Sequence, residues 1–246
     1  MPPRILLLST STVFGGSYLE YAESEIRDFL EKTNRVLFVP FALHDHKTYA
    51  ERVRRCFAQI GCAIDSLHDA SDPLGAVNRA GALFIGGGNT FRLLNRLYQL
   101  NLLGSIRGRV AAGMPYLGSS AGSNVAGPTI KTTNDMPIVQ PPSFDSLGLV
   151  RFQINPHYLD PDPASTHMGE TREERIRQFH EEDDTPVIGL REGAMLRIEQ
   201  GAMTLKGSAG ARLFRRNLPP VEIQRGRPIT DLWITTLPGS NHNPGR

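Results

Sequence analysis

A serine in a glycine-rich turn is the first feature of the sequence that suggests chemistry. The stretch MPYLGSSAGSNVAG, residues 114–127, passes from strand-like residues into the pattern Gly118-x-Ser120-x-Gly122 and then into a helix-like run. A serine on so sharp a strand-to-helix turn presents its Oγ as a nucleophile, and the first backbone N–H groups of the helix face a developing oxyanion. The alternative is a Gly- and Ser-rich turn whose serine only caps a helix. A nucleophile therefore requires a base and an orienting acid elsewhere.

A second glycine-rich turn, FIGGGNT at residues 84–90, also follows a strand-like run and precedes a helical one. In a parallel sheet, both turns lie at the carboxyl edge, where ligands bind. The backbone amides of this turn would then complete an oxyanion hole. A phosphate cradle is the functional alternative, but the turn has neither a Walker lysine nor a full G-x-G-x-x-G pattern. A close-packed structural turn is the third interpretation.

His157 is the histidine best placed to act as a base. It follows a strand-like segment in FQINPHYL, and the pair Asn155-Pro156 disfavours helix, so the ring is held at the end of a strand. His44 and His46 form a loop pair with metal-binding potential, but such a pair is more often solvated.

Two carboxylates are candidates for the group that holds the imidazole in the correct tautomer. Glu192 ends a strand-like run in VIGLREGAM, and Asp135 lies in the polar loop KTTNDMPIVQPP. Either one could instead be an ordinary turn carboxylate. The spacing of the residues leaves the choice open.

Short apolar runs alternate with helical patterns in the first half of the chain. The runs are continuous, which is typical of strands buried on both faces. The expected strands are residues 4–9, 36–39, 63–67 and 82–85, with Tyr116 and Leu117 leading into the serine turn. The first helix is expected to begin at Ser17, with Glu20 completing a capping box. This order predicts an α/β fold of three layers, a mostly parallel sheet with helices on both faces.

The second half changes in character. We expect strands at 152–155 and 186–190, a charged helix at 170–180, and a hairpin in AMLRIEQGAMTLKG that turns near residues 200–201. No repeat or linker interrupts the pattern, so residues 1–235 are predicted to form one domain. Residues 236–246, within the Pro- and Gly-bearing end, are predicted to be a flexible tail.

Composition excludes several classes of protein. The 246 residues carry a net charge of +2 without a basic tract, which argues against nucleic-acid binding. Two cysteines, Cys56 and Cys62, are too few for a disulfide framework or a zinc knuckle. No apolar stretch approaches the roughly 20 residues of a membrane span, and the N-terminal run reads as a strand, so a cytoplasmic protein is expected.

Several motifs together resemble peptidase E, the α-aspartyl dipeptidase family of serine peptidases. They are GGGNTF, SAG, TIKTTNDMPIV, QINPH, GETREERI and VIGLREG, in the family's order, from about residue 84 to 193. The resemblance implies a flavodoxin-like fold related to class I glutamine amidotransferases, with Ser120 as nucleophile and His157 as base. Glu192 and Asp135 each match a residue assigned as third member, and Glu192 is favoured because it ends a strand.

The resemblance also implies binding roles. Gly88 and Ala121 would supply the oxyanion amides. Arg172 in GETREERI would grip the aspartyl carboxylate, since a guanidinium binds a carboxylate bidentately, although its neighbours read as a solvated helix face. Further polar candidates for the substrate pocket are Asn89 and Thr133, with Glu170 or Asp135 for the substrate's amino group. Ser119 departs from the bulkier residue that relatives often carry there, which affects the pocket shape.

The sequence thus predicts a serine dipeptidase that cleaves after an N-terminal aspartyl residue, with no cofactor and no metal. Its expected partner is a small acidic dipeptide, with neither nucleic acid nor membrane, and the chain is a monomer or a homodimer. A cyanophycinase-like peptidase is the enzymatic alternative. A non-catalytic module that binds an acidic metabolite is the other.

Overall fold

The computed structural model describes residues 2–229 except 32, 167 and 227. Two sheets organise this part of the chain. The larger one contains seven strands, in the order β3 (Ala63–Ser66), β2 (Arg35–Val39), β4 (Leu83–Ile85), β5 (Tyr116–Ser119), β1 (Ile5–Leu8), β8 (Ala194–Glu199) and β9 (Ala202–Gly207). The smaller one contains four, in the order β11 (Val221–Ile223), β10 (Ala211–Phe214), β7 (Val187–Leu190) and β6 (Gln153–Pro156).

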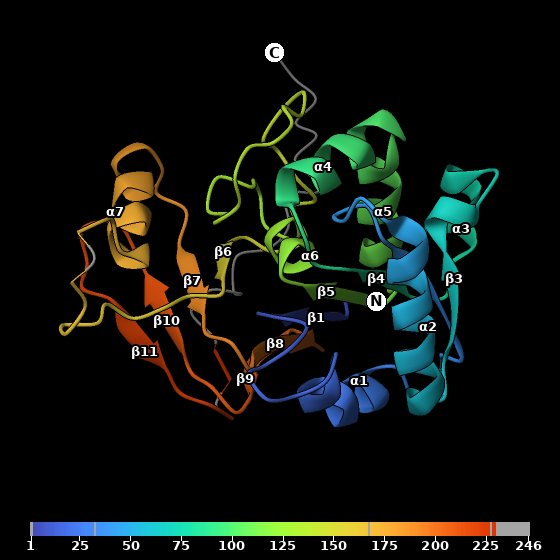
Figure 1. Ribbon diagram of the computed structural model, residues 1–246, viewed down its shortest axis with the longest axis horizontal. Coiled ribbons are helices and arrows are strands. Elements are labelled where there is room, and N and C mark those ends of the chain that lie inside the picture. The colour runs from blue at the N-terminus through green and yellow to red at the C-terminus, as the bar shows by residue number, and fades with distance from the viewer. Residues whose placement is uncertain (1, 32, 167, 227, 230–246) are drawn as a thin grey trace, which may run out of the picture.

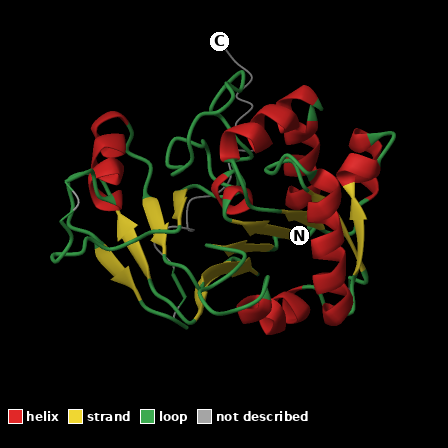
Figure 2. Ribbon diagram, in the orientation of Figure 1, coloured by secondary structure: helices red, strands yellow, loops and turns green. Residues whose placement is uncertain are grey.

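Helices cover both faces of the larger sheet (Figure 2). The helices of the described residues are α1 (Glu23–Phe29), α2 (His46–Ile60), α3 (Pro73–Arg79), α4 (Thr90–Gln99), α5 (Leu102–Ala111), α6 (Ala121–Asn124) and α7 (Arg172–Glu182). Two 3₁₀ turns, Glu20–Ala22 and Leu67–Asp69, complete the set. The three-layer α/β prediction is confirmed.

Alternation along the buried strands explains the layers. Ile5 and Leu7 of β1 belong to the core beneath α3, α4 and α5, whereas Leu6 and Leu8 belong to the core beneath α1 and α2. Because successive side chains of a strand point to opposite faces, a strand apolar at every position needs cover on both sides. Strands β1 to β5 are all parallel, so their carboxyl ends meet at one edge.

The sequence did not predict that the second half divides between two sheets. Strand β8 extends the larger sheet antiparallel to β1, and β9 pairs antiparallel with β8. Strands β6 and β7 instead run parallel to each other in the smaller sheet, which lies with α7 at one end of the molecule (Figure 1). Ile154 and Ile188 of this sheet share one continuous core with the larger sheet. The single domain over residues 1–235 stays a prediction.

The first helix begins later than predicted. Ser17 does donate its N–H to Glu20 Oε2 at 2.6 Å, but Leu19 has a left-handed φ of 58°, so a 3₁₀ turn precedes α1. The predicted tail at 236–246 lies outside the described residues. None of the described helices has both the length and the apolar content that crossing a membrane requires.

Candidate active site

The turn at Ser120 is shaped by two glycines that have no room for a side chain. A Cβ on Gly118 would lie 2.5 Å from the Gly122 carbonyl oxygen, and a Cβ on Gly122 would lie 2.0 Å from the Ile85 carbonyl oxygen. Ser120 between them adopts φ 51° and ψ −109°. This conformation is unfavourable for a residue with a side chain and is typical of strained functional turns. Ser120 is half-buried in this turn.

The neighbouring serines are not available as nucleophiles. Ser119 is fully buried, and its hydroxyl has no partner among the described residues. Ser123 is also fully buried and donates to the carbonyl oxygens of Leu8 and Gly118, at 2.6 and 2.9 Å. Only Ser120 of the three contacts a histidine.

The structure joins Ser120, His157 and Glu192 in one hydrogen-bonded series. Ser120 Oγ lies 2.9 Å from His157 Nε2, and His157 Nδ1 lies 2.6 Å from Glu192 Oε1. Strands β6 and β7 are parallel neighbours, and His157 and Glu192 follow their carboxyl ends. A serine, an imidazole and a carboxylate in this order form the arrangement that activates a hydroxyl in serine hydrolases.

Polar residues outside the series fix the end of β6. Asn134 Nδ2 donates to the Pro156 carbonyl oxygen at 2.7 Å, and Asn155 Nδ2 donates to the Thr132 carbonyl oxygen at 2.9 Å. The loop TTNDMP therefore supports the segment that carries His157. Sequence reasoning missed these two asparagines as supporting groups, although both lie within motifs that it had selected.

Asp135 lies at the first turn of α4, and no hydrogen bond joins it to His157 within the described residues. Its Oδ2 accepts from the Thr90 N–H at 2.7 Å, from Thr90 Oγ1 at 2.6 Å and from Thr133 Oγ1 at 3.1 Å. A carboxylate is stabilised at a helix N-terminus by the free N–H groups and the helix dipole. The geometry therefore selects Glu192 as the carboxylate beside the imidazole.

Asn89 and Thr133 belong to the same cluster at the start of α4. Asn89 accepts from the Arg92 N–H at 3.0 Å as the N-cap and donates to the Met136 carbonyl oxygen at 2.9 Å. Thr133 Oγ1 contacts Thr90 Oγ1 at 3.1 Å. Both predicted substrate-binding side chains are thus used to hold the loop against α4.

The glycine-rich turn after β4 packs directly against Ser120. A Cβ on Gly87 would lie 3.0 Å from Ser120 Cβ, and a Cβ on Gly88 would lie 2.6 Å from the Ala42 carbonyl oxygen. Gly88 has φ 134°, a conformation that side-chain-bearing residues rarely adopt. Ala121 is the first residue of α6, so its N–H is one that the helix does not use.

Arg172 is the first residue of α7 and lines a cavity of about 370 Å³ with Leu159, Asp160 and Glu170. Within the described residues, no carboxylate lies at ion-pair distance from its guanidinium. Partial burial lowers the pKa of Arg172, with a further lowering from Arg175, whereas the charge of Asp135 acts in the opposite direction. Arg172 is thus a part-buried cation whose charge is influenced by Asp135.

Glu170 is exposed and interacts with α7 itself. Its Oε1 accepts from Gln178 Nε2 at 2.8 Å, and Arg175 Nε lies 3.6 Å from its Oε2. The motif GETREERI owes part of its pattern to a capping box. Thr171 Oγ1 accepts from the Glu174 N–H at 3.1 Å, and Glu174 Oε2 accepts from the Thr171 N–H at 2.6 Å.

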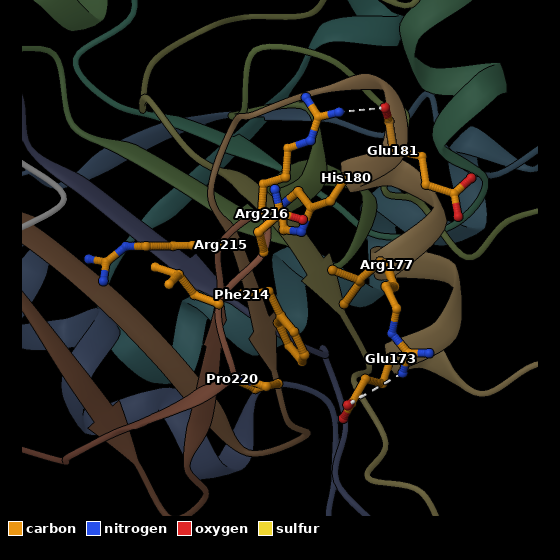
Figure 3. A pocket seen from close by; sticks show the side chains of 11 residues that line it. Glu173, Arg177, His180, Glu181, Phe214, Arg215, Arg216 and Pro220 are labelled. Carbon is orange, nitrogen blue, oxygen red and sulfur yellow. Dashed lines mark hydrogen bonds and ion pairs between the residues drawn. The ribbon is translucent and has the colours of Figure 1, made fainter.

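A separate cavity of about 450 Å³ lies between α7 and the chain after β10 (Figure 3). Ile176 and Phe214 contribute apolar surface, and arginines 177, 215 and 216 contribute charge. Among the described residues that line it, neither Ser120 nor His157 occurs. The described residues also contain no cluster of three or more His, Cys, Asp or Glu side chains that could hold a metal ion.

The fold and the Ser–His–Glu series define a serine hydrolase. The family model described as peptidase family S51 matches residues 5–206. The chain belongs to peptidase family S51, and it is a serine peptidase.

Curated relatives match over almost the whole chain. It is 54% identical over 229 residues to a protein named peptidase E from Streptomyces coelicolor, covering 93% of this chain and 94% of that one. It is 46% identical over 232 residues to a probable alpha-aspartyl dipeptidase from Drosophila melanogaster, covering 93% of this chain and 95% of that one.

Solved structures share the fold. A peptidase from an acI-B1 Actinobacterium superposes with a TM-score of 0.71 at 18% identity, covering 93% of this chain and 97% of the other. A putative peptidase E protein from Listeria monocytogenes EGD-e superposes with a TM-score of 0.64 at 22% identity, covering 84% of this chain and 99% of the other.

Proposed function

We propose that this chain hydrolyses the peptide bond after an N-terminal aspartyl residue in Asp-X dipeptides, through an acyl-enzyme on Ser120. The observation that carries the proposal is the series from Ser120 Oγ to His157 Nε2 and from His157 Nδ1 to Glu192 Oε1, at 2.9 and 2.6 Å. The names of the relatives at 46% and 54% identity support peptide hydrolysis and the aspartyl specificity.

The chemistry follows from the order of the three groups. Ser120 Oγ attacks the carbonyl carbon of the aspartyl residue while His157 Nε2 accepts its proton. Glu192 stabilises the imidazolium that forms and fixes the tautomer with the proton on Nδ1. The imidazolium then donates its proton to the leaving amine. Water, deprotonated by the same nitrogen, hydrolyses the aspartyl ester and restores Ser120.

The amides of Gly88 and Ala121 are the proposed donors to the oxyanion. The first comes from the turn that packs on Ser120, and the second begins the helix that follows it. Two fixed N–H groups stabilise the charge that appears on the carbonyl oxygen only in the tetrahedral state, which is the condition for an increase in kcat.

Arg172 is the proposed partner of the substrate's side-chain carboxylate. It is part-buried, lacks an ion-pair partner among the described residues and lines the cavity of about 370 Å³ together with Leu159 and Asp160, which follow His157 in the chain. A partly desolvated guanidinium favours an incoming carboxylate because it supplies two parallel hydrogen bonds together with charge. Asn89 and Thr133 are proposed instead to support the loop that carries Asp135, because both form hydrogen bonds at the start of α4.

The test is hydrolysis of Asp-Leu, with Ala-Leu, Glu-Leu and β-aspartyl-leucine beside it, by the wild type and by Ser120→Ala. We expect cleavage of Asp-Leu alone and its loss in the variant. Equal cleavage of Ala-Leu would reject the aspartyl specificity, and full activity of Ser120→Ala would reject the nucleophile. Cleavage of an aspartate-backbone polymer instead of the dipeptide would indicate the cyanophycinase-like activity, and binding without turnover would indicate a binding module.

Two substitutions of Arg172 test the specificity argument separately. Arg172→Met should raise KM for Asp-Leu by about 10- to 100-fold, because the substrate carboxylate loses a charged hydrogen-bonding partner. Arg172→Lys should recover only part of this loss, since an ammonium lacks the bidentate geometry. Arg177→Met, an exposed arginine of the same helix that does not line this cavity, is the matched control. A KM unchanged in Arg172→Met would show that the carboxylate binds elsewhere.

A further inference from the structure

Ser9 follows β1 directly and is fully buried. Its Oγ donates to the Leu190 carbonyl oxygen at 2.6 Å and accepts from the His157 N–H at 2.9 Å. A hydroxyl has one donor and two acceptor sites, so both bonds form at the same time. One side chain of the larger sheet therefore binds the ends of both β6 and β7 in the smaller sheet.

These bonds bracket Glu192 along the chain. Leu190 precedes it by two residues and accepts from the Ser9 hydroxyl. Ala194 follows it by two residues, and its carbonyl oxygen accepts from the Ser9 N–H at 3.1 Å. Ser9 thus limits where the Arg191–Gly193 turn can place the carboxylate.

The residue before Ser9 contacts the nucleophile side of the site. The Leu8 carbonyl oxygen accepts from the Ser120 N–H at 3.0 Å and from Ser123 Oγ at 2.6 Å. The pair Leu8–Ser9 is therefore bonded to the serine turn, to His157 and to both sides of Glu192. Three segments that are distant in sequence meet on two consecutive residues.

The backbone of His157 needs such support. Its φ of 54° lies in the left-handed region, which a histidine adopts only when its surroundings impose it. The bond from His157 N–H to Ser9 and the bond from Tyr158 N–H to the Leu190 carbonyl oxygen, at 3.1 Å, are the contacts that impose it.

We propose that Ser9 is a positioning residue that aligns His157 and Glu192 with Ser120, a role that rests on the proposed function. Ser9 does not touch the substrate. Its hydroxyl fixes the distance between the serine turn on the larger sheet and the base and carboxylate on the smaller one. Removal of the hydroxyl leaves the His157 N–H and the Leu190 carbonyl without this partner and lets the imidazole move.

Ser9→Ala tests this role, with Ser146→Ala as the matched control. Ser146 is also a buried serine, and its Oγ donates to the Gly127 carbonyl oxygen at 2.6 Å without contacting the series. We expect Ser9→Ala to lower kcat for Asp-Leu by about 10- to 100-fold with KM unchanged, since small misplacements of reacting groups have effects of this size. Ser146→Ala should lower the stability of the fold and leave kcat unchanged.

Imidazole nitrogen NMR of His157 provides a readout independent of the substrate. In the wild type, we expect the proton on Nδ1, the nitrogen that faces Glu192, and in Ser9→Ala a mixture of tautomers. If the wild type does not cleave Asp-Leu, the proposed function fails, while the NMR comparison still tests the role of Ser9. A kcat and an NMR signal in Ser9→Ala that match those of Ser146→Ala would overturn the proposal.

Ser9→Cys decides the matter if Ser9→Ala does not fold. A thiol fills nearly the same volume but forms only weak hydrogen bonds, so Ser9→Cys weakens both bonds without leaving a cavity. A kcat below that of Ser146→Cys with a perturbed His157 signal supports the positioning role. An unchanged kcat with an unperturbed signal overturns it.

Discussion

Ser120 and His157 both have positive φ angles, 51° and 54°, but different contacts impose them. At Ser120 the constraint is steric, because Gly118 and Gly122 bring backbone atoms closer than any Cβ allows. At His157 the constraint is polar, because the His157 N–H donates to Ser9 Oγ and Asn134 Nδ2 donates to the Pro156 carbonyl oxygen.

The two constraints fail in different ways. A methyl group added to a tightly packed turn collides with backbone atoms, so its main effect is to destabilise the fold. Removal of one hydroxyl or amide from a hydrogen-bonded segment disturbs the alignment of the catalytic groups before it destabilises the fold. We therefore expect substitutions of the glycines in the serine turn to lower mainly the stability of the fold, whereas substitutions of the residues that support His157 should lower mainly kcat.

The largest expected effect is that of Gly122→Ala. The new Cβ would lie 2.0 Å from the Ile85 carbonyl oxygen, a backbone atom of a buried strand that cannot move aside. We expect a loss of about 3 kcal/mol or more of stability, measured by denaturant unfolding. Gly104→Ala in α5 is the control, since nothing lies within 4 Å of its Cβ position, and it should gain about 0.5–1 kcal/mol. Similar stabilities of the two variants would contradict the steric account.

Glu192→Gln and Asp135→Asn distinguish a carboxylate that acts on His157 from one that stabilises the start of α4. Glu192→Gln should lower kcat by about 10²- to 10⁴-fold with little change in unfolding free energy, because the amide cannot stabilise the imidazolium. Asp135→Asn should lower the unfolding free energy by about 1 kcal/mol, because the carboxylate stabilises the start of α4. It should lower kcat less than Glu192→Gln does. If Asp135→Asn instead showed the larger loss of kcat, Asp135 would be the functional carboxylate.

A smaller and pH-dependent effect is expected at Asp160, three residues after His157. Its hydrogen bond to Arg191 lowers the pKa of Asp160, and the same guanidinium lowers the pKa of Glu222. A lowered pKa in the folded state means that the stabilisation is present above the ordinary carboxyl pKa of about 4 and is lost as pH falls through the folded value. Asp160→Asn should therefore lower Tm at pH 7 and approach the wild type near pH 3. A Tm difference that does not vary with pH would show that charge is not the cause.

The smallest expected effect is that of Ser119→Ala, next to the nucleophile. The buried hydroxyl of Ser119 has no partner among the described residues, so its removal forfeits no protein hydrogen bond. We expect a change within about 0.5 kcal/mol in unfolding free energy, and an unchanged kcat. A large loss of either quantity would mean that the hydroxyl supports the turn.

The contrast also explains what could be read from the sequence. The serine turn was predicted because glycine spacing and an adjacent apolar run are local signals. The parallel strands of the first half were predicted for the same reason, since each is a continuous apolar run. Helix α3 was missed although the sequence contains its signals, Asp72 as N-cap and Pro73 at the first position.

Local sequence signals did not predict the smaller sheet or its contribution to the site. Strands β6 and β7 were found as strands, but their sheet also depends on β10, which comes later in the chain and pairs with β7. The choice between Glu192 and Asp135 likewise depends on which loop reaches His157, and the positions of the two residues in the sequence left both candidates open. Ser9 gave no signal of its own, because a serine after a buried strand is common and its partners lie 148 and 181 residues away.

The central claim is that Ser120 carries an aspartyl group during turnover. The direct measurement is rapid acid quenching of the wild type during Asp-Leu hydrolysis, followed by mass spectrometry of the peptide that contains Ser120. We predict a mass increase of one aspartyl residue on Ser120, its absence in Ser120→Ala, and a lower occupancy in Ser9→Ala at the same quench time if acylation limits that variant. Undiminished hydrolysis by Ser120→Ala, without any adduct in the wild type, would contradict the account.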